Sequence, residues 1–449
     1  MNNKSNDLTV GRLSKQILFL SLPLMLSNLL QVLFNISDVA VVGKFAGAYA
    51  LGAVGSTSIL LTLFLAVPIG LAGGINVLTA LAIGSKSKKD VSETVHSAAI
   101  ISLIAGLMLL TVGMVFARHI LQLLNTKEEL INGAVAYLHI YFLGMPALSL
   151  YNFGNAVFSA GGNTKKPLLY LTIAGILNVI LNLFFVIVLK IDVRGVAAAS
   201  AISQYVSAFL IVKDLFRSHE IYRLRWSEMR LATKKAERIL QIGIPSAFQY
   251  MIYSVANLFV QSGVNSFSAT VVAGNSAAMN ADNLVYDVMA AFYTVCGTFM
   301  GQNLGARNKD RVMKSYLISL LYSTLIAVVV GLLLVIFGHQ FLGLFANEKD
   351  VIAAGMDRLV IMGLCYWLSA PMDCTTAATR ALGKTVIPTI IMILGSCVFR
   401  IVWIYTVFAA FGTTISIYLL YGVSWLITGI PEVIYFIYIY RKTVRELNL

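Results

Sequence analysis

The sequence predicts an all-α polytopic membrane protein with twelve transmembrane helices in two six-helix lobes related by pseudo-two-fold symmetry. Three observations support this prediction: the composition, the distribution of positive charge and an internal repeat. Of the 449 residues, 58% are hydrophobic and 12% are charged, whereas a soluble protein carries about 25% charged residues. Apolar segments follow one another along the whole chain, and a segment of about 20 residues crosses a bilayer as a helix.

The first apolar segment begins near Ile17 and contains Pro23 and Asp38. It is too long for a cleavable signal and lacks a small-residue cleavage site, so we interpret it as the first span. The predicted spans are residues 16–42, 52–80, 95–117, 132–158, 167–189, 195–213, 238–263, 270–300, 314–337, 352–378, 386–409 and 414–440. Four cysteines lie in apolar segments without metal-type spacing, and we expect packing roles and no disulfide: Cys296, Cys365, Cys374 and Cys397.

Lysine and arginine fall unevenly on the two sides of these spans. One side receives 25 of the 33 and the other six, while Arg358 and Arg400 lie inside spans. The positive-inside rule then places both chain termini in the cytoplasm, as an even number of spans also requires. The net charge of +13 is therefore a topology signal. We expect the lipid bilayer as a partner, with no nucleic acid.

The two halves of the chain match each other at a shift of about 221 residues. Because each half holds six spans, both halves have the same orientation, which predicts lobes related by an axis along the membrane normal. Such lobes can rock around a central cleft, so the repeat favours a carrier over a channel. The matching segments are 17–23 with 239–245, 82–86 with 303–307, 123–131 with 344–352, and 159–167 with 380–388.

This repeat divides the chain into an N-lobe at 1–213, a linker at 214–237 and a C-lobe at 238–449. The linker carries charges of both signs and is interpreted as a cytoplasmic segment that could include an amphipathic surface helix. The glycine-rich segments before Pro167 and Pro388 lack Walker spacing, so we interpret them as tight turns before the next helix. With no ATPase motif, the energy for transport has to come from an ion gradient or from the substrate's own gradient.

Polar residues within the N-lobe spans suggest a cation site. A carboxylate at bilayer depth costs about 2.5–3.5 kcal/mol on insertion scales, so Asp38 is expected to face a cavity or a partner. Asn178 and Asn182 are four residues apart and share a helix face, and Ser200 lies on a small-residue helix that can pack closely. Together these four side chains would offer oxygens to Na⁺ or a carboxylate that exchanges H⁺. Ordinary hydrogen bonding between helices is the alternative for the two asparagines and the serine.

The C-lobe spans carry further charged residues. Asp282 shares a helix face with Tyr286 and is the expected second functional acid, while Asp287 lies close to the opposite side and could stand near a cavity wall. The candidates for C-lobe coupling or substrate binding are Asp282, Tyr286, Asp287, Asp373 and Arg400. Asp373 and Arg400 could form a structural ion pair. Aromatic and methionine side chains in spans 7 and 8 could line a pocket for flat cations, or simply pack between helices: Met251, Tyr253, Met279, Tyr286, Met289 and Tyr293.

Over nearly its whole length the chain resembles the multidrug and toxic compound extrusion (MATE) family of prokaryotes. The resemblance rests on the repeat, the Pro23 to Asp38 first span, the two Gly-x-Thr-x-x-Pro turns, the 301–306 end of span 8, and Asn178, Asn182, Gly195 and Ser200. It implies a twelve-helix exporter of cationic drugs, driven by Na⁺ or H⁺ antiport. It further implies small-molecule substrates, no cofactor, a monomer, and a bacterial or archaeal plasma membrane.

In the family, the N-lobe cation site combines an Asp in span 1, an Asn and an Asp four apart in span 5, and a Thr in span 6. Asp38 and Asn178 match that pattern, whereas Asn182 stands in place of the Asp and Ser200 in place of the Thr. The hydroxyl is kept and one negative charge is lost. This difference weakens the case for tight Na⁺ binding at Asp38 and Asn178 and leaves H⁺ coupling through Asp38 more open. The span 7 acid of another branch is absent, and Asp373 stands near that branch's span 10 acid.

Two other functions fit the sequence less well than efflux. A flippase for lipid-linked sugars, from the same superfamily, would line its cavity with arginine or lysine to hold pyrophosphate, yet these spans carry acids at least as prominently. A membrane-embedded enzyme would need a nucleophile with a base or metal-type histidine spacing. Neither pattern is present, and we expect no enzymatic activity.

Overall fold

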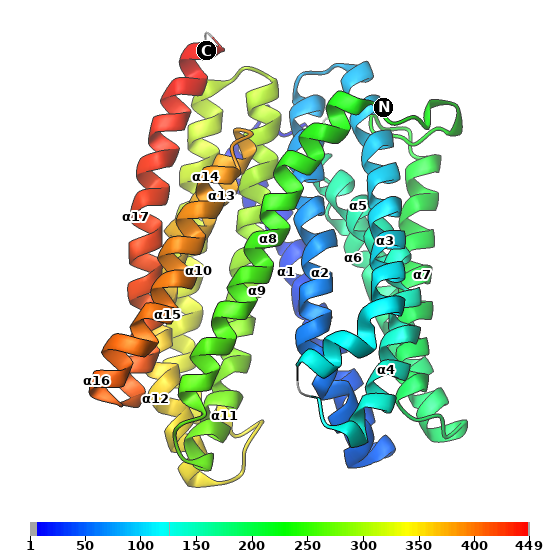
Figure 1. The fold of residues 1–449 in the computed structure, drawn as a ribbon. Helices are drawn as coiled ribbons and strands as arrows, with labels where there is room; N and C mark the ends of the chain where they lie inside the picture. The colour runs from blue at the N-terminus through cyan, green and yellow to red at the C-terminus, as the bar shows by residue number, and fades with distance from the viewer. Residues whose placement is uncertain (1–6, 125, 448–449) are drawn as a thin grey trace. The chain divides into compact units, whose positions relative to one another are not determined.

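The computed structural model describes residues 7–124 and 126–447, and this part of the chain is helical, with no strand. The helices pack into two units, one formed by Leu26–Phe248 and the other by Leu8–Met25 with the chain from Gln249 onward. Figure 1 shows the long helices running side by side within each unit. The boundaries between the units fall inside two long helices, Leu13–Val41 and Thr233–Val264. Because these units are defined by packing and not by chain order, the predicted lobe boundaries at 213 and 238 stay a prediction.

The first half of the chain forms eight α-helices with three short π- or 3₁₀-helical segments. They are α1 Leu13–Val41, η1 Val42–Ala46, α2 Gly47–Gly84, α3 Lys88–Leu123, α4 Glu128–Leu143, α5 Met145–Ala160, α6 Lys165–Leu183, η2 Phe184–Val188, α7 Val193–Arg217, η3 Trp226–Glu228 and α8 Thr233–Val264.

The second half continues with nine α-helices and three more short segments. They are α9 Ala269–Gly305, α10 Lys309–Ile336, α11 Gly338–Leu342, α12 Lys349–Cys365, η4 Tyr366–Leu368, α13 Ser369–Ala381, α14 Val386–Met392, η5 Ile393–Val398, α15 Phe399–Trp403, η6 Ile404–Phe408, α16 Ala409–Phe411 and α17 Thr414–Glu446.

The predicted spans coincide with these helices. Ten continuous segments of the described chain are long and apolar enough to cross a membrane, and α4 with α5 makes one more span, bent by 46°. The 32-residue α8, with Pro245 inside it, corresponds to the seventh predicted span and brings the number of long helices to twelve. Several helices exceed the predicted spans, α2 reaching 38 residues. Hydropathy detects the part of a helix that lies in lipid, and about 20 residues suffice for that part.

The bend in the fourth span has a local cause. Gly144 stands between α4 and α5, followed by Pro146 near the start of α5. Proline lacks the backbone N–H that would continue the helical ladder, so a helix bends or restarts there. In the tenth span, 3₁₀ geometry over η4 precedes Pro371 in the same way.

The internal repeat is visible in the backbone. Among the described residues other than glycine, Lys86 and Arg307 both have φ of 57° at positions that the sequence repeat pairs. Gly162 and Gly383 have φ of 77° and 75°, so both glycine turns adopt the left-handed conformation that glycine permits. The predicted tight turns are thereby confirmed. The π-helical turns η2 and η6 also begin at the same point of the repeat, 220 residues apart.

The predicted amphipathic helix in the linker is wrong. Within 214–237 the structure has the end of α7, a loop containing η3, and the start of α8. The loop packs onto α3: the backbone N–H of Arg225 donates to His96 Nε2 at 2.9 Å, and Glu228 accepts a hydrogen bond from Ser92. Tyr222, only 3% exposed, packs on the tight turn at Gly161. Anchored side chains, and not an apolar helix face, hold this segment.

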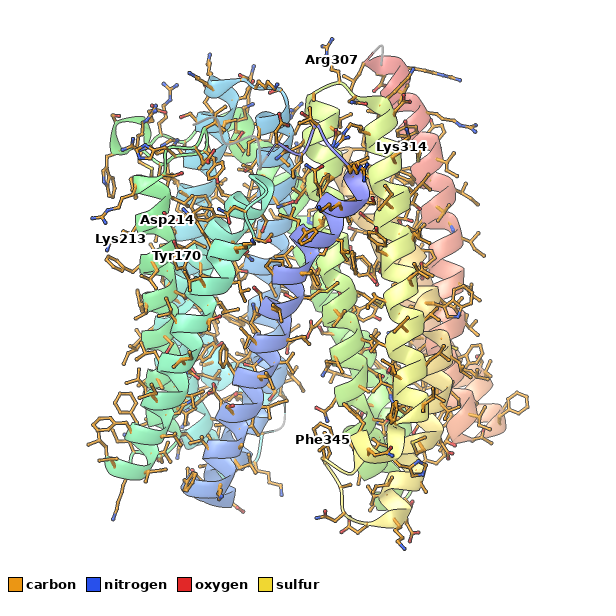
Figure 2. All side chains as sticks on the ribbon, turned by 180° about the vertical axis from the view of Figure 1, so that it is seen from behind. Tyr170, Lys213, Asp214, Arg307, Lys314 and Phe345 are labelled. Carbon is orange, nitrogen blue, oxygen red and sulfur yellow. The ribbon has the colours of Figure 1, made fainter. Side chains whose placement is uncertain are left out.

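Basic residues gather with acidic partners at one end of the first unit. Lys166 pairs with Asp214 at 2.7 Å, and the hydroxyl of Tyr170 donates to the same carboxylate at 2.8 Å; Figure 2 labels Tyr170 and Asp214 on adjacent helices. Lys235 pairs with Asp90 at 2.5 Å. Two of the basic groups that the sequence assigned to one side, Lys166 and Lys235, therefore have acidic partners in this unit. That this end faces the cytoplasm stays a prediction.

Close helix contacts in the first unit depend on glycine. A Cβ atom added to Gly70 on α2 would lie 2.5 Å from the backbone nitrogen of Ala247 on α8. One added to Gly175 on α6 would lie 1.8 Å from the ring of Phe34 on α1. Small residues allow this approach, as is common between membrane helices. The second contact brings α1 against α6 within one turn of Asp38.

Candidate functional site

In the first unit, Asp38, Asn178, Asn182 and Ser200 form one hydrogen-bonded cluster. The Asn182 amide donates to Asp38 Oδ1 and, at 3.2 Å, to Asn178 Oδ1. The Ser200 hydroxyl donates to Asp38 Oδ2 at 3.3 Å and accepts from the Asn178 amide, also at 3.3 Å. The structure thus brings together all four residues that the sequence singled out, from α1, α6 and α7.

The charge of this cluster is unbalanced. Asp38 is its one acidic member, and its hydrogen-bond donors are a neutral amide and a neutral hydroxyl. Asp38 is partly exposed, whereas Asn182 is fully buried. Tyr137 and Tyr141 of α4 also lie close enough to interact electrostatically with Asp38. The sequence reasoning missed these tyrosines, although their spacing of four places both on one face of α4.

The donor set suits a small hard cation. The four residues carry five oxygen atoms, which are the ligands that Na⁺ and similar ions prefer. Asn182 Oδ1 is buried and accepts no hydrogen bond, so a bound cation or a protonated Asp38 would give it a partner. No group of three or more His, Cys, Asp or Glu side chains suited to a metal occurs in the described residues.

The second unit holds a cavity of about 380 Å³, within the usual size range of small-molecule sites. Asp282, Tyr286 and Asp373 line it, as the sequence suggested for a C-lobe site, whereas Asp287 and Arg400 do not. Of the aromatic and methionine candidates, Met251 and Tyr293 also lie outside it. The remaining lining residues are Gln249, Tyr250, Tyr253, Ser254, Asn257, Leu258, Gln261, Met279, Asn283, Val285, Met289, Arg358, Met362, Tyr366, Ser369, Met392, Tyr421 and Trp425.

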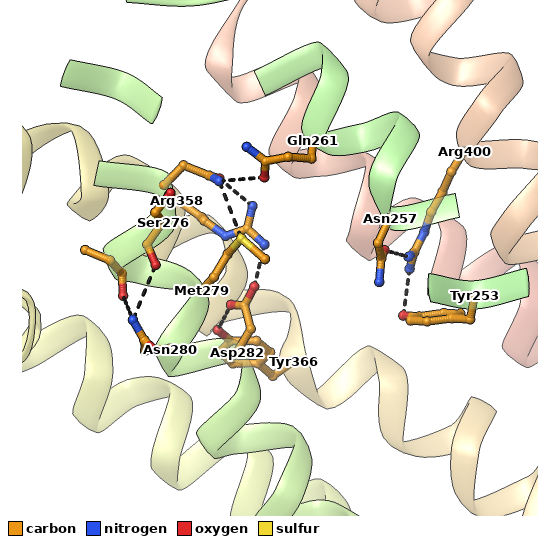
Figure 3. A network of polar contacts seen from close by, with 12 residues as sticks. Tyr253, Asn257, Gln261, Ser276, Met279, Asn280, Asp282, Arg358, Tyr366 and Arg400 are labelled. Carbon is orange, nitrogen blue, oxygen red and sulfur yellow. Dashed lines mark hydrogen bonds and ion pairs between the residues drawn. The ribbon is translucent and has the colours of Figure 1, made fainter. Parts of the chain in front are cut away.

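Asp282 is held in a partly buried ion pair that the sequence did not predict. Its carboxylate accepts hydrogen bonds from the Arg358 guanidinium and the Tyr366 hydroxyl. Arg358 is 2% exposed and also donates to Asn275 Oδ1 at 2.8 Å. Figure 3 shows Asp282 between Arg358 and Tyr366. The sequence does carry a signal for this pair, because an arginine inside a span needs a partner and Arg358 lies inside a span.

The expected Asp373–Arg400 ion pair is wrong, since these side chains do not pair in the structure. Arg400 is fully buried and donates to Ser424 Oγ at 3.1 Å, Asn257 Oδ1 at 2.8 Å and the Tyr253 hydroxyl at 3.0 Å. Its guanidinium also lies 4.7 Å from the ring centroid of Tyr253. Neutral oxygens and an aromatic face can satisfy a guanidinium without a carboxylate, so pairing by charge alone gave the wrong partner.

These features define a multi-pass helical membrane transporter with a polar cluster in one unit and a substrate-sized cavity in the other. A protein-family model described as MatE matches residues 23–184 and again 245–406. The chain therefore belongs to the MATE family, whose members are multidrug efflux transporters and not enzymes. The two matches are offset by 222 residues, which confirms the internal repeat.

Individual relatives agree with this assignment. A protein of Bacillus subtilis, named as a probable multidrug resistance protein, is 29% identical over 81% of both chains. The solved structure of a MATE protein in complex with MaL6 has a TM-score of 0.92 at 21% identity and covers 98% of this chain and 99% of its own. A transporter from Pyrococcus furiosus, described as having reverse polarity of its binding pocket, has a TM-score of 0.91 at 21% identity over 98% of both chains.

Proposed function

We propose that this protein is a cation-coupled antiporter that exports organic compounds, with Asp38 as the group that exchanges the coupling ion. The observation that carries the proposal is the lone carboxylate of Asp38 among neutral oxygens and amides. A single negative charge at bilayer depth is stabilised by one added positive charge, whether H⁺ or Na⁺. Each charge that crosses the membrane gains about 2.3 kcal/mol per 100 mV. That gain supplies the energy for export.

H⁺ is the coupling ion we favour. The cluster has one formal charge, and its Asn182 amide can serve both states of Asp38. In the structure, the amide N–H donates to the carboxylate; after the amide group rotates by 180°, its oxygen would accept a hydrogen bond from the protonated acid. Na⁺ remains the alternative, since the same five oxygens fit it. The two outcomes are separated by imposing one gradient at a time.

For the substrate we propose a flat organic cation bound in the cavity of the second unit. Tyrosine faces and adaptable methionines line much of it. Because Arg358 balances Asp282, Asp373 is the cavity carboxylate that remains to attract a cation. We further propose that the protein works as a monomer in a prokaryotic plasma membrane, with both termini in the cytoplasm.

One observation favours the lipid-linked sugar flippase as a second candidate. Arg358 and Arg400 are both buried beside the cavity, and arginine is the residue best suited to bind a pyrophosphate. Arg358 is neutralised by Asp282, however, and Arg400 already donates to three neutral oxygens. Efflux of a cation therefore stays the first proposal.

The test is transport in proteoliposomes under a defined gradient. Wild-type protein should export a fluorescent organic cation when an H⁺ gradient is imposed, and Asp38→Asn should lower the gradient-driven rate to background. Asp350→Asn, an exposed carboxylate in the first turn of α12, is the matched control and should transport like wild type. Full gradient-driven efflux by Asp38→Asn would refute the coupling role. Translocation of a lipid-linked sugar without cation efflux would favour the flippase.

A further inference from the structure

Glu432 is a buried acid for which transport through Asp38 and the cavity gives no role. It follows Pro431 inside α17 and is 0% exposed. Neither carboxylate oxygen accepts a hydrogen bond, and no ion pair within 4.0 Å includes it among the described residues. A buried carboxyl group without partners is unusual, because nearly all buried polar atoms have one.

The charged groups that interact electrostatically with Glu432 lie on α13, which packs against α17. Arg380 and Asp373 both act on it electrostatically. The Thr376 hydroxyl also lies nearby, yet it donates to the Met372 carbonyl at 2.9 Å. On α17 itself, Tyr435 is the neighbouring titratable group.

The other buried arginines are engaged elsewhere. Arg358 on α12 and Arg400 on α15 contact the Tyr421 ring, which precedes Glu432 by eleven residues of α17, or about 16 Å of helix. Among the described residues, Arg380 is therefore the arginine whose charge acts on Glu432.

Arg380 is held away from Glu432 by a residue of the cavity. Its Nη2 donates to Gln249 Oε1 at 2.5 Å, while its buried Nε has no hydrogen-bond partner. Gln249 lines the cavity and so does Asp373. The Arg380 guanidinium is thus bonded to the cavity residue Gln249 and has an N–H at Nε without an acceptor, while its charge acts on Glu432.

An ionised carboxylate buried without a partner costs several kcal/mol, whereas the neutral acid costs far less. In this arrangement Glu432 therefore carries its proton. We propose that Glu432 is a second proton-binding site, coupled to the cavity through Arg380 and Gln249. A ligand that engages Gln249 frees the guanidinium to pair with Glu432. The carboxylate then forms, and its proton leaves to water.

This inference rests on the proposed function, because it takes the cavity as the substrate site. It adds an exchange in which substrate entry itself expels one proton from the second unit. The proton is bound when Arg380 is held by Gln249 and released when Arg380 pairs with Glu432. The two states differ by one O–H bond broken and one ion pair made.

The experiment separates proton binding from transport. Variants are prepared in lipid nanodiscs on an Asp38→Asn background, so that Asp38 contributes no proton. Difference infrared spectroscopy then reports the carbonyl stretch of protonated carboxyl groups. Glu432→Gln should lose one such band, whereas Glu446→Gln, an exposed acid on the same helix, should keep it. An unchanged band in Glu432→Gln would overturn the proposal.

Proton release on ligand binding is measured in the same samples with ethidium, a flat aromatic cation, and a pH electrode in weak buffer. The expected release is about one proton per bound ligand for the parent and for Glu446→Gln, and none for Glu432→Gln. Equal release by Glu432→Gln overturns the coupling. Failure of ethidium to bind at all counts against the cavity as a cation site, while the infrared band still decides whether Glu432 holds a proton.

Gln249→Leu provides a second route should Glu432→Gln fail to fold. It leaves the acid in place and removes the amide that holds Arg380. Glu432 should then pair with Arg380 without ligand, so its protonated band disappears and ligand binding releases no proton. Persistence of that band in Gln249→Leu would show that Gln249 does not control the acid.

Discussion

Asp38 and Asp282 have the same number of hydrogen-bond donors but differ in the charge of those donors. Each accepts two hydrogen bonds from side chains of neighbouring helices. The donors to Asp38 are an amide and a hydroxyl, whereas the donors to Asp282 include the guanidinium of Arg358. The carboxylate of Asp38 keeps a full negative charge that a mobile cation can neutralise. The charge of Asp282 is already neutralised by the guanidinium of Arg358. Counting acids in spans therefore overstates how many can exchange ions.

The sharpest way to break this comparison is to remove the fixed partner. Arg358→Leu should leave the carboxylate of Asp282, which is 21% exposed, without its cation. The free energy of unfolding should fall by about 1–3 kcal/mol, less than for a fully buried pair. Thermal unfolding in detergent measures the loss. Arg445→Leu, at an exposed arginine of α17, is the control and should leave stability within about 0.5 kcal/mol of wild type.

The double variant Asp282→Asn/Arg358→Leu should regain part of that stability, because no unpaired buried charge is left. Equal losses in the single and double variants would mean that Arg358 acts through packing on the Tyr418 and Tyr421 rings. The contrast between fixed and exchangeable carboxylates would then fail.

A second change gives the Asp38 cluster the second acid that the family pattern implies. Asn182→Asp places a second carboxylate beside Asp38, and the unit charge it adds interacts with a cation 4 Å away by about 4 kcal/mol at an effective dielectric of 20. Repulsion between the two carboxylates offsets much of this gain. We expect Na⁺ to bind roughly tenfold more tightly, read from the Na⁺ concentration that half-saturates efflux.

Asn178→Asp is the matched control for this change, because it adds the same charge one helical turn away. The hydrogen bonds to Asp38 come from Asn182 and Ser200, whereas the Asn178 amide donates to Ser200. A smaller gain there than at Asn182 is expected. Equal Na⁺ dependence in both variants and wild type would show that the missing acid does not set ion choice.

The sequence sufficed to predict the twelve spans and the Asp38 cluster, for identifiable reasons. Asn178 and Asn182 lie one helical turn apart, and a buried carboxylate must find partners, so few arrangements were open. It did not predict the pairing of Arg358 with Asp282. Which buried arginine meets which acid depends on helix rotation and tilt, and hydropathy carries neither.

Glu432 was missed for a different reason. In the sequence it stands alone after Pro431, near the basic end of the last span, where a charged residue is ordinarily expected to reach water. Only the packing of α13 against α17 shows that it is buried. The loop after α7 was misjudged similarly, because its mixed charges fit a surface helix as well as anchors to α3.

Ser200→Ala is the mildest change, and the effect expected on efflux depends on which ion is coupled. The hydrogen bond from Ser200 to Asp38 is long, at 3.3 Å, so its loss is worth about 1 kcal/mol, roughly a fivefold change in affinity. With Na⁺, the hydroxyl oxygen is a lost ligand, and the half-saturating Na⁺ concentration should rise. With H⁺, the lost donor had favoured the carboxylate, so half-maximal efflux should move to higher pH. Ser200→Thr keeps the hydroxyl and should match wild type in both assays, so a shift there as large as in Ser200→Ala would assign the effect to packing of α7 and not to Asp38.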